Sequence, residues 1–178
     1  MASKLKFDRR LVLALGIACA ATGCGYHEAG RATSLPPDVK TIAIPTFVNQ
    51  TARFRIEQML TSAVTRQFIE RTNFQITHTV AGADAVLRGT VKSVQATAVT
   101  FDPSTGRATA FQIEVRAAVQ LIDLHSKKVL FSNPNYVFRE QYQVSESAPA
   151  LFEEDTPALR RLSRDFARTL VTDIVENF

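Results

Sequence analysis

Apolar and polar residues alternate through the middle of the chain, the pattern of β-strands whose two faces differ. The alternation predicts three long strands, at residues 85–101, 111–122 and 128–143. Short turns separate them, the first being Asp102-Pro-Ser-Thr-Gly-Arg107, and strands joined by such turns pair antiparallel. Asn133-Pro-Asn135 interrupts the third strand and predicts a bulge or an edge kink there.

Two other segments repeat apolar residues every three or four positions, the spacing of amphipathic helices. The first has Thr51 as a candidate N-cap and ends at Arg71-Thr-Asn73. Its repeating apolar residues are Phe54, Ile56, Met59, Leu60, Ala63, Val64 and Phe68. The second begins at Asp155 or Thr156, with Pro157 in its first turn. Its repeating apolar residues are Leu159, Leu162, Phe166, Leu170, Ile174 and Phe178.

Two shorter strands complete the pattern, at residues 39–48 and 74–79. Pro45 has no N–H to donate, so the first of them lies at an edge or ends near this residue. The resulting order predicts an α+β fold with two helices packed on one face of a mixed, largely antiparallel four-to-five-stranded sheet. No internal repeat and no second domain is evident, so residues 39–178 are expected to form a single domain.

The N-terminus has the features of an export signal, with basic residues followed by the apolar run Leu11–Ala21. A short buried helix is the alternative, but it would need a polar face that this run lacks. The run leads into Ala21-Thr-Gly-Cys24, which resembles the lipobox of bacterial lipoproteins. The resemblance implies that residues 1–23 are a lipoprotein signal peptide, that Cys24 is acylated and that residues 24–38 form a lipidated tether.

Two alternatives to this lipid anchor exist. Cys19 is a competing site that would shorten the apolar run, and ordinary cleavage would leave the Cys24 thiol unmodified. Two or three acyl chains anchor a protein stably where one is marginal. By resemblance to bacterial lipoproteins, Gly25 after the cysteine permits sorting to the outer membrane. With Cys19 removed and Cys24 acylated, the chain keeps no thiol for a disulfide, a metal or a nucleophile.

Composition narrows the class of protein. The 178 residues are 46% hydrophobic, which suits one globular domain, and no apolar run reaches the roughly 20 residues of a membrane-spanning helix. The net charge of +4 suggests a nucleic-acid partner, but residues 1–23 hold four of the 21 basic residues and one of the 17 acidic ones. The rest of the chain therefore has a formal charge of about +1, and no nucleic-acid partner is expected.

The sequence shows no catalytic or metal-binding motif. None of the three histidines, His27, His78 and His125, lies at metal-ligand spacing from a Cys, a His or an acidic residue. Glu153-Glu-Asp155 could act as paired acids, but acidic residues at a helix N-terminus need no further explanation, because they oppose the helix dipole. We therefore expect a protein that is not an enzyme and that carries no metal or cofactor.

Two groups of basic residues are candidates for binding. Arg160, Arg161, Arg164 and Arg168 follow one side of the second helix, as a solvated face or as a contact for an acidic partner. Arg107 lies at the tip of the hairpin between the first two long strands, where it could meet a phosphorylated ligand. The alternative for Arg107 is an exposed turn residue.

In their order along the chain, these segments resemble the LptE-like lipopolysaccharide-assembly lipoproteins. The likeness is carried by Cys24-Gly-Tyr-His27, Thr41-Ile-Ala-Ile-Pro-Thr-Phe47, Asn49-Gln-Thr51, Ala83-Asp-Ala-Val-Leu-Arg-Gly89 and the turn that ends at Arg107. It implies two helices on a four-stranded sheet and direct binding of lipopolysaccharide. The family's ligand-binding basic residue lies near the hairpin tip, and Arg107 is its nearest positional match.

The resemblance also implies a partner, because such lipoproteins sit in the lumen of a large outer-membrane β-barrel, LptD, as its plug and assembly aid. We therefore expect an outer-membrane, lipid-anchored protein that takes part in lipopolysaccharide transport, with its domain in the barrel lumen or facing the periplasm. The alternative is a lipoprotein regulator of a cell-wall synthase or of a secretion pore, whose domains also begin with a strand like Ile42–Phe47. Those domains place helices between most strands, unlike residues 85–143. A periplasmic hydrolase would need a polar cluster that the sequence does not supply.

Overall fold

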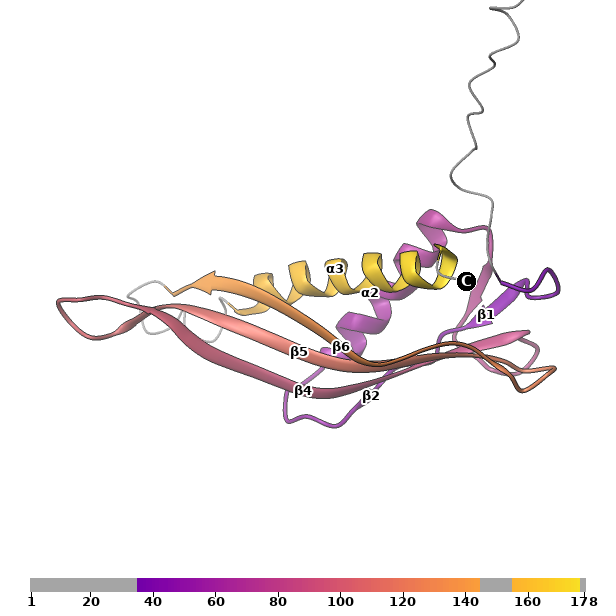
Figure 1. Cartoon of the computed structure of the whole chain (residues 1–178), viewed down its shortest axis with the longest axis horizontal. Coiled ribbons are helices and arrows are strands. Elements are labelled where there is room, and N and C mark those ends of the chain that lie inside the picture. The colour runs from indigo at the N-terminus through magenta and orange to yellow at the C-terminus, as the bar shows by residue number, and fades with distance from the viewer. Residues whose placement is uncertain (1–34, 145–154, 177–178) are drawn as a thin grey trace, which may run out of the picture. The chain divides into compact units, whose positions relative to one another are not determined.

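The computed structural model describes residues 35–144 and 155–176 (Figure 1). Its strands are β1 (Thr41–Ala43), β2 (Val48–Asn49), β3 (Gln75–Thr77), β4 (Ala85–Phe101), β5 (Ala108–Asp123) and β6 (Val129–Gln143). Its helices are α2 (Ile56–Arg71) and α3 (Asp155–Glu176). The three long predicted strands and both predicted helices are confirmed, with ends that differ by a few residues. The predicted signal peptide, Cys24 and most of the predicted tether lie outside the described residues.

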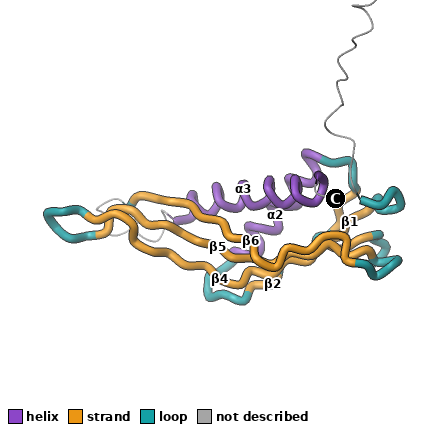
Figure 2. Tube along the Cα trace, in the orientation of Figure 1, coloured by secondary structure: helices purple, strands orange, loops and turns teal. Residues whose placement is uncertain are grey.

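The six strands of the described ranges form one sheet in the order β3-β1-β4-β5-β6, with β2 also paired to β4. The long pairings, β4 with β5 and β5 with β6, are antiparallel. The short pairings, β1 with β3 and β4 and β2 with β4, are all parallel. Both helices lie on the same side of this sheet (Figures 1 and 2). The predicted α+β fold is confirmed, but the sheet is mixed rather than largely antiparallel.

The predicted first strand is split in two around Pro45. It ends at Ala43, and the chain re-enters the sheet as β2 at Val48. Between them the backbone finds other partners, since Phe47 N–H donates to the hydroxyl of Thr61 on α2 at 3.0 Å. Of the two alternatives for Pro45, an edge strand or a strand end, the structure has the strand end, and β1 lies between β3 and β4.

The predicted N-cap of the first helix is wrong. Thr51 donates its N–H and its hydroxyl to the side-chain oxygen of Asn49, at 2.9 and 2.8 Å, and so belongs to a turn. The helix starts four residues later, after Arg55, whose left-handed φ of 61° redirects the chain and whose side chain makes no capping bond. A threonine before an apolar repeat is compatible with a turn as well as with an N-cap, because its hydroxyl can form local hydrogen bonds in either structure.

The predicted interruption of the third long strand is a β-bulge. Asn133 pairs with Val119 and Tyr136 pairs with Ala117, so two residues of β6 lie opposite the single residue Ala118. Pro134 is one of the two residues in the bulge, where its lack of an N–H costs no ladder bond.

The core lies between the sheet and the two helices. Alternate residues of β5, from Ile113 to Leu121, are buried against this side, whereas their neighbours face the opposite side of the sheet. Phe166 of α3 meets three aromatic rings of the sheet side edge to face, those of Phe47, Tyr136 and Phe138. Gly89 makes room for this cluster, because a Cβ atom there would lie 2.4 Å from the ring of Phe47.

Asp84 joins three segments at the start of β4. One of its carboxylate oxygens accepts the backbone N–H groups of Lys40 and Thr41, at 2.9 and 2.8 Å. The other oxygen lies 3.1 Å from Nε2 of His125, in the turn between β5 and β6. Foremost among the causes, the bonds from Lys40 and Thr41 lower the pKa of Asp84 from 3.8 to about 2.

This bond network predicts a pH dependence. Because the folded-state pKa of Asp84 is lowered, its carboxylate stabilises the fold above about pH 3.8, and that contribution is lost as the pH falls towards 2. We expect Asp84→Asn to lower the melting temperature at pH 7 by roughly 2–4 °C. Between pH 5 and pH 2, the melting temperature of this variant should fall less than that of wild type. Thermal unfolding followed by circular dichroism measures both. Asp38→Asn, at an exposed carboxylate, serves as the control, and identical acid profiles for Asp84→Asn and wild type would contradict the assignment.

Candidate functional site

The hairpin of β4 and β5 extends beyond the N-terminus of α3 (Figure 1). The first seven residues of β4 are mostly buried, whereas the strand is largely exposed from Gln95 to Phe101. No helix of the described ranges packs on this outer part of the hairpin (Figure 1). It therefore offers a surface that the core does not use.

The turn at the hairpin tip is held by Asp102. Its Oδ1 accepts the backbone N–H groups of Ser104 and Thr105, at 2.7 and 2.9 Å, and the hydroxyl of Ser104 at 2.6 Å. These bonds, led by the one from the Ser104 hydroxyl, lower the pKa of Asp102 below its usual value. Gly106 takes a φ of 65°, a conformation that glycine adopts without strain. The tip is therefore an ordered turn.

Arg107 lies at this tip, as the sequence predicts. Its backbone carbonyl accepts the N–H of Asp102 at 2.8 Å, and its side chain is exposed. No ion pair among the described residues involves Arg107. The backbone of Arg107 is thus held at the end of the hairpin, and its exposed guanidinium is open to an anionic ligand from solution.

Apolar side chains lie near Arg107 at the hairpin tip, and the sequence pattern did not predict their exposure. Val99 is 42% exposed and Phe101 is 57% exposed, and Phe101 pairs with Ala108 next to the turn. They continue the alternation of β4 beyond the residues that the core buries. The length of the predicted strand was the sequence feature that could have indicated this exposed apolar surface. Together with Arg107 they make the hairpin tip amphipathic.

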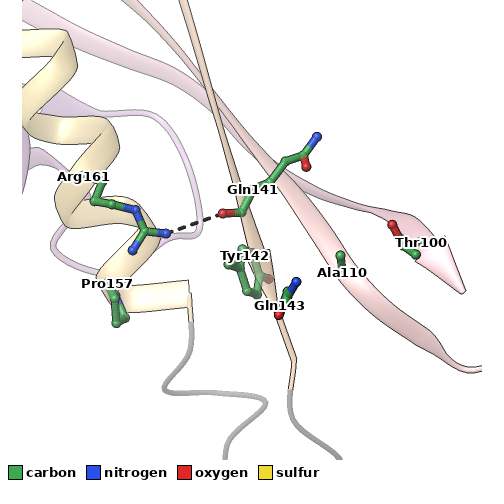
Figure 3. Close-up of a pocket in the computed structure, with 7 residues that line it drawn as sticks. All are labelled: Thr100, Ala110, Gln141, Tyr142, Gln143, Pro157 and Arg161. Carbon is green, nitrogen blue, oxygen red and sulfur yellow. Dashed lines mark hydrogen bonds between the residues drawn. The ribbon is translucent and has the colours of Figure 1, made fainter. Parts of the chain in front are cut away.

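A polar hollow of about 600 Å³ is lined by residues from the start of α3 and from the outer parts of β4, β5 and β6 (Figure 3). Arg161 of α3 points across it and donates to the carbonyl of Gln141 on β6 at 3.4 Å. The same guanidinium pairs with Glu140 at 2.5 Å. Tyr142, on the wall of the hollow, stacks on Phe111 with ring centroids 5.8 Å apart. Arg161 therefore fixes the start of α3 to β6, unlike the other three arginines of its predicted group.

The side of the sheet away from the helices is mostly polar along the middle of the three long strands, and a small apolar cluster with Val86 and Ile122 lies at its end near the start of β4. Glu114 on β5 accepts Nε–H of Arg116 and of Arg139, each at 2.7 Å, and these bonds, that of Arg116 first, lower the pKa of Glu114. Gln95 and Gln112, which lie on the same side, continue the polar surface. We call this surface the open sheet face. No helix of the described ranges covers it (Figure 1).

The two histidines of the described residues have structural surroundings. His125 pairs with Asp84, and Nδ1 of His78 lies 3.1 Å from the carbonyl oxygen of Ile44. No group of three or more His, Cys, Asp or Glu residues in the described ranges is arranged to hold a metal. Within those ranges, neither helix is long and apolar enough to cross a membrane. Glu153 and Glu154 lie outside them.

Comparisons with known proteins agree with this fold. The sequence profile of one family, described as LptE: Lipopolysaccharide-assembly, matches residues 39–174. Rare lipoprotein B from Shewanella oneidensis is 12% identical with a TM-score of 0.50, over 75% of this chain and 92% of that one. Lipoprotein B from Nitrosomonas europaea is 14% identical with a TM-score of 0.50, over 79% and 88%. PelC from Paraburkholderia phytofirmans, a dodecamer, is 14% identical with a TM-score of 0.50, over 77% and 89%. No curated protein matches the chain.

Proposed function

The chain belongs to the LptE family of lipopolysaccharide-assembly proteins, and from this premise we propose that it plugs an LptD-like outer-membrane β-barrel, assists its assembly and helps to deliver lipopolysaccharide to the cell surface. The family is one of non-catalytic assembly proteins, so the protein would act through packing and ligand contact. Its anchor would be acyl chains on Cys24, with residues 1–23 removed and residues 24–38 as the tether.

The observation that best supports the barrel partner is the open sheet face. The lumen of a membrane β-barrel is polar, so a plug must present polar surface to it. The ion-paired Glu114, Arg116 and Arg139 supply such a surface without an unpaired carboxylate. The core needs no partner to cover it, because the helices seal the other side of the sheet. This division of polar and apolar surface supports a domain that would keep its own fold inside the barrel. Copurification with the barrel, described at the end of the Discussion, is the test.

The amphipathic hairpin tip supports the contact with lipopolysaccharide. The ligand combines phosphate groups with acyl chains, and the tip combines a guanidinium with exposed apolar side chains. Arg107 can pair with a phosphate through two N–H donors, while Val99 and Phe101 offer apolar contact beside it. The ordered turn at Asp102 would keep the backbone of Arg107 in a fixed position for this contact.

The role of Arg107 predicts a loss of ligand affinity on substitution. A charge-assisted hydrogen bond contributes about 1.5–3 kcal/mol, so we expect Arg107→Gln to weaken the binding of purified lipopolysaccharide by about tenfold or more. Arg88→Gln removes another exposed arginine, near the other end of β4, and should leave the affinity unchanged. Binding of labelled lipopolysaccharide to the full-length protein in detergent measures both. Equal affinities of Arg107→Gln and wild type would contradict the role.

A further inference from the structure

A groove of about 500 Å³ runs along the surface where α2 and α3 meet, apart from the hairpin tip. The two helices pack directly, and Arg71 of α2 donates to the hydroxyl of Thr172 on α3 at 3.1 Å. Small residues form the floor of the groove, among them Ala63 on α2 and the buried Ser163 and Ala167 on α3. Small side chains keep the groove open and allow another backbone to approach closely.

The rim of this groove is strongly basic. Arg66 lies on the α2 wall and Arg160, Arg164 and Arg168 lie on the α3 wall, against the single acidic residue Glu70. Within the described residues, Arg66, Arg160 and Arg164 have neither an ion pair nor a side-chain hydrogen bond, and only Arg168 is paired, with Asp165.

Elsewhere in the described ranges, three exposed arginines pair with carboxylates, whereas the exposed Arg88 and Arg107 have no ion pair. Arg116 and Arg139 share Glu114, and Arg161 has Glu140. In the groove, by contrast, four arginines lie close together with one acidic residue. Their mutual repulsion lowers the stability of the fold, and the fold does not need these charges to form its core. Such an arrangement is typical of a surface that meets an anionic partner.

We propose that the groove docks an acidic amphipathic helix of a partner protein. The three arginines of α3 are spaced four residues apart, which places them about 6 Å apart along the helix axis. Glutamates spaced four residues apart on a partner helix repeat at the same distance, so a helix lying along α3 can pair in register with Arg160 and Arg164, and its next glutamate reaches Arg168, which Asp165 already pairs. Arg66 closes the site from the α2 wall, and the small floor residues receive the partner's apolar edge.

A lipid surface fits these features less well. Binding to a bilayer needs large apolar side chains that enter it, together with the basic ones. None of the large hydrophobic residues that are exposed in the described ranges lines the groove, whose apolar contribution comes from alanines and Met59. The groove therefore matches a helix better than a membrane.

The test uses the full-length protein in detergent and a fluorescein-labelled helical peptide of about 18 residues, with glutamates at four-residue intervals beside an alanine and leucine edge. We expect the peptide to bind at least about tenfold more tightly than its Glu→Gln counterpart, measured by fluorescence anisotropy. The double variant Arg160→Gln/Arg164→Gln should lose about tenfold in affinity. Lys40→Gln/Lys128→Gln, which removes the same charge from exposed sites outside the groove, should not.

Three results would overturn the proposal. They are no binding of the acidic peptide, equal loss in both double variants, and capture of phosphatidylglycerol vesicles through Arg160 and Arg164 without capture of the peptide. Neither a barrel nor lipopolysaccharide enters this assay. Its failure would therefore leave the proposed function standing, and loss of barrel copurification would leave the groove standing.

Discussion

Replacing Cys24 by alanine is expected to abolish acylation of the protein. If the lipobox resemblance is correct, Cys24 carries the diacylglycerol and becomes the first residue of the mature chain. At about 0.8 kcal/mol for each buried CH₂ group, two or three acyl chains supply nearly all of the affinity of such a protein for a bilayer. Radioactive palmitate labelling, with intact-mass measurement of the purified protein, should show full incorporation in wild type and none in Cys24→Ala.

The second cysteine provides a matched control for this experiment. Cys19 lies within the apolar run of the signal, so Cys19→Ala should keep normal labelling and the same mature mass as wild type. Loss of label in Cys19→Ala with retention in Cys24→Ala would move the site to Cys19. Retention in both variants would contradict lipidation at either cysteine.

Phe166→Ala is expected to lower the free energy of unfolding by about 3–5 kcal/mol, the largest effect of any substitution proposed within the domain. The ring is fully buried and meets Phe138, Tyr136 and Phe47, with ring centroids 5.3, 5.7 and 6.3 Å away. Its removal leaves a cavity between α3 and the sheet, at the point where Tyr136 also donates its hydroxyl to Asp173 at 2.6 Å. Urea unfolding followed by circular dichroism measures the loss.

Phe54→Ala is the matched control for Phe166→Ala. Phe54 is 78% exposed, and its ring contacts only the guanidinium of its neighbour Arg55 among the ring contacts of the described residues. We expect this substitution to change the free energy of unfolding by less than about 0.5 kcal/mol. Comparable losses in the two variants would mean that the aromatic cluster does not join α3 to the sheet.

The long elements could be predicted from the sequence because their patterns extend over many residues. The alternation from Ala85 predicts the bounds of β4 as the structure has them, and the turn that ends at Arg107 places this arginine at the hairpin tip. In these segments local propensity and burial agree, so the pattern alone decides the structure.

Short elements and pairings could not be predicted in the same way. The split of the first strand depends on Thr61 of α2, which captures the N–H of Phe47, and on parallel pairing of β2 with β4. The true start of α2 depends on the left-handed turn at Arg55. Such features arise from contacts with residues distant in sequence, and a window of neighbouring residues does not contain them.

The candidate site residues also differ in whether a local sequence pattern or the packing of distant elements reveals them. Arg107 could be found because a turn marks it, but the exposure of Phe101 depends on where α3 begins relative to the hairpin. The four arginines of α3 look alike in sequence. The structure separates Arg161, which binds Glu140 on β6, from the three that face α2, and only the packing of the two helices makes that distinction.

Copurification tests the central claim most directly, namely that this lipoprotein works as the plug of an outer-membrane barrel. The full-length protein with a C-terminal tag is extracted in mild detergent, and its bound proteins are identified by mass spectrometry against an untagged control. The proposed function predicts one large outer-membrane β-barrel protein in an amount comparable to that of the tagged chain. Recovery of a cell-wall synthase or a secretion ring in its place, or of no barrel at all, would contradict it.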